Sequence, residues 1–266
     1  MYKAYFGLRE KPFGKTPDPR FLFLAPGHEE ALARLEYAVE EREIALLTGD
    51  VGCGKTTLSR ALMDRCGAGC RFVLIFNPRM AALEFLRTVA HGLEIDQPAR
   101  GKDDLLRQIT GVLYDLYRAG ACPVLVVDEA QTITDLEVFD EIRLLTNYQL
   151  DSHNLLAVLI MGQPELRSIL RYQPLEPLRQ RIALQYHLQP LTLEETMEYL
   201  DFRMTAAGGA AGQFTPDALQ AIHELSGGVP RRINTIATNA LLVAYGADAA
   251  MVDAAIVNEV KDEGIL

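Results

Sequence analysis

One short stretch limits the fold of this 266-residue chain more than any other. It fits the pattern G-x-x-x-x-G-K-[ST] at every fixed position, and it consists of Gly49, Asp50, Val51, Gly52, Cys53, Gly54, Lys55 and Thr56. An apolar run at 43–49, EIALLTG, precedes it, and a helical pattern begins at Lys55 and continues to Cys66. A buried strand, a glycine-rich loop and a helix in this order predict a loop that binds the phosphates of a nucleotide.

The fixed positions of this loop each have a chemical role. The glycines let backbone N–H groups curve around the β-phosphate, while Lys55 reaches the β and γ oxygens. The hydroxyl of Thr56 is expected to bind Mg²⁺, and the adjacent Thr57 completes the set of residues expected to contact the nucleotide. The helix that begins at Lys55 directs the positive end of its dipole at the phosphates.

A second Gly-Lys-Thr, at 14–16, fails the same test. Arg9 stands five residues before Gly14, where the pattern requires glycine. No strand pattern precedes this copy, and Pro17 follows it directly. We therefore assign phosphate binding to Lys55 and not to Lys15.

The first 27 residues instead predict an irregular arm. Phe13, Phe21 and Phe23 occur there among prolines, which stiffen the backbone. We expect this arm to pack across the core near the nucleotide base, or onto a neighbouring subunit.

Alternating patterns along the rest of the chain predict the fold class. Short apolar runs indicate buried strands at 43–49, 71–77, 123–130, 155–162 and 182–188. Helical patterns occur at 28–42, 55–66, 80–93, 102–120 and near 136–149. Such alternation predicts an α/β fold, in which helices cover both faces of a parallel sheet.

After Pro190 only helical patterns follow. TLEE at 192–195 reads as a capping box, and further helices are expected at 215–228, 230–246 and 251–263. We therefore expect an arm at 1–27, an α/β nucleotide-binding core at 28–190 and an α-helical lid at 191–266.

Composition excludes several classes of protein. The net charge of −10 argues against a non-specific coat protein for nucleic acid, although a local basic patch around Arg231 and Arg232 stays open. The four cysteines lack the spacing of a zinc site and read as reduced thiols. No signal peptide is visible, and the longest apolar run, at 155–162, is too short to cross a bilayer. We expect a cytoplasmic protein, either free or held at the inner membrane through a partner.

Polar side chains follow two of the expected strands. Asp128 ends the run PVLVVDEA and can hold Mg²⁺ through water. The adjacent Glu129 is placed to polarise an attacking water, and this second acid favours hydrolysis over transfer to a small molecule. Gln163 directly follows the strand at 155–162, from where it can reach between these acids and the γ-phosphate.

Three arginines complete the candidate site. Arg179 and Arg181 precede the last strand, and either can act as an arginine finger on the nucleotide of a neighbouring subunit, which implies a homo-oligomer. Arg231 begins a helix of the expected lid, where its charge opposes the helix dipole. That placement suggests an anionic partner, and we expect Arg231 to touch the γ-phosphate.

This combination of motifs resembles an AAA+ ATPase of the P-loop NTPase class, except that GQPEL has Gln163 where the first sensor is often Asn. The arm, GQPEL and LRQRI resemble the ExeA/GspA-like family, including its MshM-like form, which serves type II secretion and MSHA-type pilus assembly. The ATPases of the TniB/TnsC type are more distant relatives. The resemblance implies that ATP and Mg²⁺ bind, that ATP is hydrolysed, and that the partners are envelope secretion, pilus or polysaccharide-export components.

Three functions stay open at this point. The first is an ATPase that assembles or positions an envelope machine. The second is a DNA-associated transposition regulator, and the third is a nucleotide-gated scaffold with little turnover. The sequence does not distinguish a ring from a filament or a dimer. It also leaves open whether the protein lacks a transmembrane and peptidoglycan-binding extension.

Overall fold

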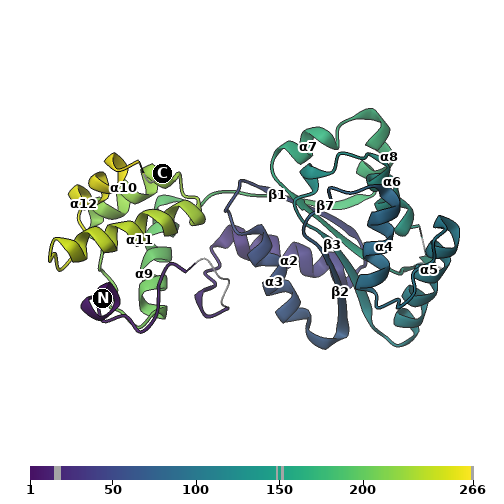
Figure 1. Cartoon of the computed structure of the whole chain (residues 1–266), viewed down its shortest axis with the longest axis horizontal. Coiled ribbons are helices and arrows are strands. Elements are labelled where there is room, and N and C mark those ends of the chain that lie inside the picture. The colour runs from purple at the N-terminus through teal and green to yellow at the C-terminus, as the bar shows by residue number, and fades with distance from the viewer. Residues whose placement is uncertain (15–18, 148, 151–152, 265–266) are drawn as a thin grey trace. The chain divides into compact units, whose positions relative to one another are not determined.

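A computed structural model of the chain describes residues 1–14, 19–147, 149–150 and 153–264. The chain forms two compact units, whose elements are labelled in Figure 1. The sheet unit consists of His28–Gly49 and Leu58–Leu188, and the helical unit consists of Met1–Gly27, Asp50–Thr57 and Gln189–Leu266. Lys15 and Thr16, from the rejected copy of Gly-Lys-Thr, lie outside the described residues.

Five parallel strands in the order β2-β3-β6-β1-β7 form the centre of the sheet unit. They are β1 (Ile44–Gly49), β2 (Cys70–Ile75), β3 (Cys122–Val127), β6 (Ala157–Gly162) and β7 (Ile182–Leu188). The strands β4 (Gln149–Leu150) and β5 (His153–Asn154) form a separate antiparallel pair. The inner strands β1 and β6 are buried at every position, as their apolar sequences require, whereas the edge strand β7 is partly exposed. The predicted parallel α/β sheet is therefore confirmed.

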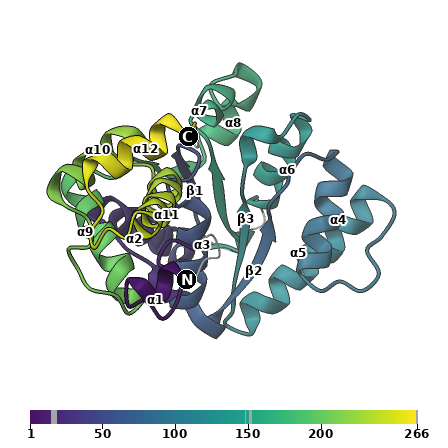
Figure 2. The same cartoon turned by 60° about the vertical axis from the view of Figure 1, so that its left-hand side comes forward.

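Helices cover both faces of this sheet, as Figures 1 and 2 show. On one face lie α2 (Pro26–Glu40) and α3 (Lys55–Cys66). The other face carries α4 (Ala82–Gly92), α5 (Lys102–Arg118) and α6 (Glu137–Leu145). Two short helices that the sequence patterns did not predict, α7 (Glu165–Ile169) and α8 (Glu176–Arg179), precede β7.

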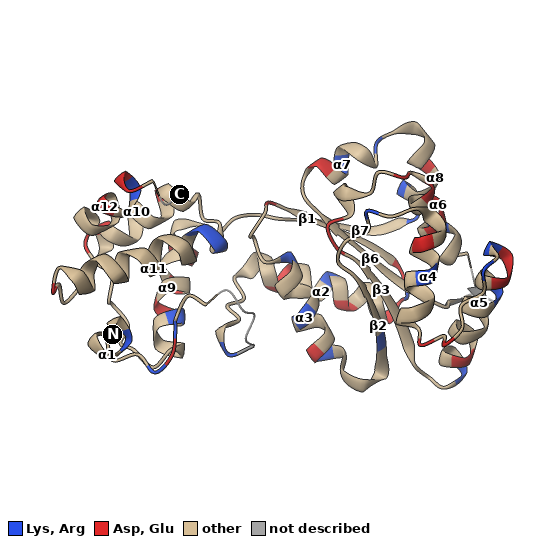
Figure 3. Ribbon diagram, in the orientation of Figure 1, with Lys and Arg blue, Asp and Glu red and all other residues tan. Residues whose placement is uncertain are grey.

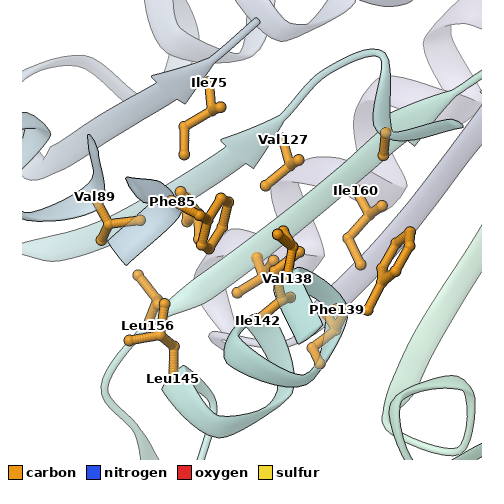
Figure 4. Packing of buried hydrophobic residues seen from close by; sticks show 14 of the residues in the cluster. Ile75, Phe85, Val89, Val127, Val138, Phe139, Ile142, Leu145, Leu156 and Ile160 are labelled. Atoms are coloured by element: carbon orange, nitrogen blue, oxygen red, sulfur yellow. The ribbon is translucent and has the colours of Figure 1, made fainter. Parts of the chain in front are cut away.

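The core beneath α4, α5 and α6 is a continuous apolar cluster. Ile75, Val127 and Ile160 project into it from the neighbouring strands β2, β3 and β6 (Figure 4). Phe85 of α4 and Phe139 of α6 are fully buried against them. Each such side chain contributes about 1.5–3 kcal/mol to the free energy of folding, so this cluster holds the strands firmly against α4, α5 and α6.

In the described part of the helical unit, four helices follow the sheet in the sequence. They are α9 (Leu193–Ala206), α10 (Pro216–Ser226), α11 (Pro230–Gly246) and α12 (Ala254–Asp262). The predicted capping box at the start of α9 is confirmed. The Thr192 hydroxyl accepts the Glu195 N–H at 3.2 Å, and the Glu195 carboxylate accepts the Thr192 N–H at 2.8 Å.

The arm contacts these helices and is not wholly irregular. It begins with α1 (Tyr2–Tyr5) and includes a short 3-10 turn at Pro19–Phe21. Its aromatic rings meet residues of the helical unit, with Phe13 at 6.2 Å from Phe214 and Phe23 at 5.7 Å from Tyr199 between ring centroids. The expected docking on the nucleotide-binding core was therefore wrong for these rings, because the helical unit offers them an apolar cluster of its own.

Candidate functional site

The loop after β1 has the backbone conformation that its glycines permit. A Cβ atom on Gly49 would lie 2.8 Å from the Leu188 carbonyl oxygen, so no side chain fits at the end of β1. Gly52 and Gly54 have φ values of 89° and 102°, which residues other than glycine rarely adopt. Helix α3 then begins at Lys55, so the loop leads directly into a helix N-terminus.

Lys55 is buried within this loop, with only 5% of its surface exposed. Its Nζ donates a hydrogen bond to the Asp50 carbonyl at 3.0 Å, which keeps the ammonium group over the loop backbone. Cys53 is fully buried beside it, and burial raises the pKa of its thiol, so this group is neutral at pH 7. A buried ammonium group at a helix N-terminus, with Thr56 and Thr57 in the first turn, fits a phosphate chain in charge and in donors.

The start of α11 lies against the same loop within the helical unit. The Arg231 N–H donates to the Gly52 carbonyl at 3.3 Å, and a Cβ on Gly52 would lie 2.6 Å from the Arg231 Cβ. Arg232 instead donates to the Leu225 carbonyl at 2.7 Å, at the end of α10. Both arginines are exposed, and Figure 3 shows this end of α11 in blue. Of the two, Arg231 is the one beside the glycine loop.

The carboxyl edge of the sheet carries the two acids that follow β3. Asp128 is 2% exposed, and its N–H donates to the Ile75 carbonyl at 2.8 Å, which extends the pairing of β3 with β2. The strand ends at Val127 and not at residue 130 as predicted, because Glu129 turns into the left-handed region with φ 53°. The Glu129 N–H donates to Asp128 Oδ1 at 2.8 Å, so the turn is held by the neighbouring acid.

Two amide side chains hold the Glu129 carboxylate. Its Oε2 atom accepts hydrogen bonds from Gln131 Nε2 at 2.5 Å and from Gln163 Nε2 at 3.1 Å. Gln131 Oε1 accepts the backbone N–H of Gln163 at 3.0 Å, which closes the network. Gln163 follows β6 directly, and β6 pairs with β3, so the sheet itself brings these residues together. The sequence patterns did not single out Gln131, since a lone glutamine in a loop carries no spacing signal.

The two candidate arginine fingers lie at the opposite edge of the sheet. Arg181 precedes β7 and donates to the Thr146 hydroxyl at 3.1 Å, at the end of α6. Arg179 forms an ion pair with Glu176, which lowers the pKa of that carboxyl group. The seven residues of β7 separate Arg181 from the carboxyl edge by roughly 20 Å along the strand. Arg181 and Glu129 of one sheet unit therefore do not act on the same phosphate.

Fold and loop together define a nucleotide-binding protein of the P-loop class, and the chain belongs to the AAA domain family, whose sequence pattern matches residues 38–170. It is 40% identical over 254 residues to general secretion pathway protein A of Aeromonas hydrophila. That match covers 92% of this chain and 45% of the relative, so the chain spans less than half of the relative's length. The resemblance to the ExeA/GspA-like family is confirmed by this relative.

Solved structures of similar fold confirm the AAA+ architecture. The ORC2 protein of Aeropyrum pernix superposes with a TM-score of 0.71 at 18% identity, over 96% of this chain and 71% of its own. Cdc6p of Pyrobaculum aerophilum gives 0.68 at 21% identity, over 89% and 68% of the two chains. At these identities the likeness concerns the fold alone. Within the described residues, no helix is long and apolar enough to span a bilayer.

Proposed function

We propose that this chain binds ATP together with Mg²⁺ and hydrolyses it to ADP and phosphate. The observation that carries this proposal is the Glu129 carboxylate, which two amide groups hold next to the buried Asp128. A carboxylate fixed in this way is suited to orient a water molecule and accept its proton. Membership of the AAA domain family supports the same activity.

The glycine loop supplies the residues for binding. Backbone N–H groups from Gly49 to Thr57 and the Lys55 ammonium bind the phosphates in this proposal, and Arg231 reaches the γ-phosphate. The Thr56 hydroxyl and the Asp128 carboxylate are hard oxygen donors, of the kind that Mg²⁺ prefers alongside phosphate oxygens. When bound, the metal neutralises charge that develops on the phosphate oxygens.

Water activation is assigned to Glu129, with Gln163 as its partner at the edge of the sheet. An arginine from a neighbouring subunit, Arg181 or Arg179, stabilises the charge of the transferred phosphoryl group. This role requires a homo-oligomer, because both arginines lie at the amino edge of their own sheet, far from its carboxyl edge.

Two substitutions test binding and turnover separately. Lys55→Ala is expected to lose binding of a fluorescent ATP analogue. Glu129→Gln is expected to bind it as the wild type does, while its kcat for phosphate release falls roughly 10²-fold or more. Glu165→Gln, on the exposed surface of α7, is the matched control and keeps wild-type turnover. Equal turnover in Glu129→Gln and wild type would favour a nucleotide-gated scaffold with little hydrolysis.

The cellular role that we propose is the assembly or positioning of an envelope machine for secretion, pilus formation or polysaccharide export. It is supported by the likeness to general secretion pathway protein A. We place the protein in the cytoplasm, free or held at the inner membrane through such a partner. Cross-linking in cells with the Glu129→Gln variant should capture an envelope component, since a slowly hydrolysing form holds its partner longer.

The alternative cellular role is association with DNA. A mobility shift of duplex DNA with ATP at two salt concentrations tests for it, because binding through phosphates weakens steeply with salt. If the shift depends on salt and no envelope component is cross-linked, the DNA-associated role replaces the proposed secretion role. The proposed ATPase activity would still stand.

A further inference from the structure

The side chain of Gln131 is hydrogen-bonded at both ends of its amide group. Its Nε2 donates to Glu129 Oε2 at 2.5 Å, and its Oε1 accepts the Gln163 N–H at 3.0 Å. An amide that donates to a carboxylate and accepts from the backbone has its orientation fixed by chemistry, since exchanging its two ends would lose both bonds. Gln131 therefore connects the end of β3 to the end of β6.

The chain leaves space for this amide at one position. A Cβ atom on Gly162, the last residue of β6, would lie 2.7 Å from Gln131 Oε1 and 2.7 Å from Leu166 Cδ2. Any side chain at Gly162 would thus compete with the Gln131 amide for the same space. Gly162 does not have a positive φ, so its backbone conformation does not require glycine. The close approach of Gln131 and Leu166 does.

The network engages one oxygen of Glu129 and leaves the other available. Oε2 receives both amide donors, whereas Oε1 accepts no hydrogen bond from any residue that the structure describes. The backbone of Glu129 is held in the left-handed region at φ 53°, a conformation that costs about 1 kcal/mol for a residue with a side chain. Fixed contacts at Oε2 and at the backbone together orient Oε1.

We propose that Gln131 is a positioning residue for ATP hydrolysis, which fixes the Glu129 carboxylate through Oε2 so that Oε1 is directed at the attacking water. This inference rests on the proposed ATPase function. Gln131 itself exchanges no proton with water or nucleotide. Its acceptor end ties the position of Glu129 to the backbone of Gln163, so the two ends of the amide have separable effects.

Two substitutions at Gln131 separate the donor end from the acceptor end. Gln131→Met keeps the length of the side chain and removes both hydrogen bonds. Gln131→Glu keeps an acceptor for the Gln163 N–H and replaces the donor with a second carboxylate facing Glu129. We expect kcat to fall roughly 10- to 100-fold in both, because a misplaced reacting group loses rate steeply, while the affinity for ATP stays as in the wild type. Wild-type kcat in Gln131→Glu would overturn the proposal, since the donor to Glu129 would then be dispensable.

A double substitution shows whether Gln131 acts through Glu129. In the Glu129→Gln background, adding Gln131→Met should cause no further fall in kcat, because the carboxylate that Gln131 positions is already gone. A further fall as large as that in the wild-type background would contradict the proposal. The matched control is Gln220→Met, which removes an amide that donates to Glu224 on α10 and should leave kcat unchanged.

The same variants also serve to check folding and the proposed ATPase activity. Urea unfolding of Gln131→Met should match the wild type closely, so a loss of kcat cannot be a loss of folded protein. Gly162→Ala is a second route to the same effect. Its Cβ would displace the Gln131 amide, so kcat should fall although residue 131 is still glutamine. If wild type and Glu129→Gln both lack turnover, the proposed ATPase function fails. If they differ and Gln131→Met equals wild type, only the present inference fails.

Discussion

Each of the two units contains a polar cluster, and the two clusters hold different parts of the chain in place by hydrogen bonds. At the edge of the sheet, amide groups hold the Glu129 carboxylate by one oxygen only. In the helical unit, Arg203 is 8% exposed, and its guanidinium carbon lies 4.8 Å from the centroid of the Phe21 ring and 5.6 Å from that of the Tyr199 ring. It donates to backbone carbonyls of the arm, among them Pro12 at 2.6 Å.

The difference lies in what each cluster holds in place. Arg203 directs its donors at main-chain oxygens and at a tyrosine hydroxyl, and it stacks on aromatic faces, so it fastens the arm to α9. Glu129 is held through Oε2, and its Oε1 accepts no hydrogen bond from the residues that the structure describes. We therefore expect substitutions at the sheet edge to change kcat with little effect on unfolding. Substitutions in the arm cluster should change the free energy of unfolding with little effect on kcat.

The largest expected effect comes from the proposed arginine finger of the sheet unit. Arg181→Ala should lower kcat about 10³-fold, because arginine fingers contribute effects of that size, and it should leave ATP affinity unchanged. Its hydrogen bond to Thr146 is worth only about 1 kcal/mol, so urea unfolding should shift little. Steady-state phosphate release at saturating ATP is the measurement.

Mixing variants tests whether this arginine acts on another subunit. Lys55→Ala subunits keep the arginine and lose the nucleotide, while Arg181→Ala subunits do the reverse. Mixed oligomers should recover part of the wild-type turnover. Arg179→Ala is the comparison, because Arg179 is already paired with Glu176. Loss of turnover in Arg179→Ala together with wild-type turnover in Arg181→Ala would move the role to Arg179.

The fold was predictable because its sequence signals are local. Buried strands give apolar runs, and the helices between them give 3.6-residue patterns, so β1 and α3 are predicted within a residue or two. The glycine loop is a contiguous motif, and the two acids follow a buried strand directly.

Other features depend on contacts between distant segments, which a single sequence does not display. Gln131 matters only because β6 brings Gln163 to its amide. Arg203 reads as an ordinary charged residue of an amphipathic helix, yet it contacts the arm more than 180 residues earlier in the chain. The sequence displays the aromatic residues of the arm but not their partners on the helical unit, since apolar character does not specify the partner.

The arm cluster provides the next largest effect. Arg203→Ala should lower the free energy of unfolding by about 3 kcal/mol, since it removes charge-assisted hydrogen bonds and leaves carbonyls of the arm without a donor. Arg203→Lys should recover little of this, because an ammonium group lacks the planar fork that reaches several carbonyls at once. Urea unfolding measures both variants. A fall in kcat of Arg203→Ala under conditions where it is fully folded would break the contrast between the two clusters.

The smallest expected effect concerns the start of α9, the helix that carries Arg203. Thr192→Ala removes the hydroxyl that accepts the Glu195 N–H, and loss of such a cap costs about 1 kcal/mol. Thr192→Ser keeps the hydroxyl and is the matched control, so its unfolding should follow the wild type. Thr192 is exposed and lies about three turns of α9, roughly 16 Å, from Arg203, so the two losses should add when Thr192→Ala is combined with Arg203→Ala. A combined loss smaller than the sum would mean that α9 frays as soon as the arm is released, and that the arm, more than the cap, holds this helix in place.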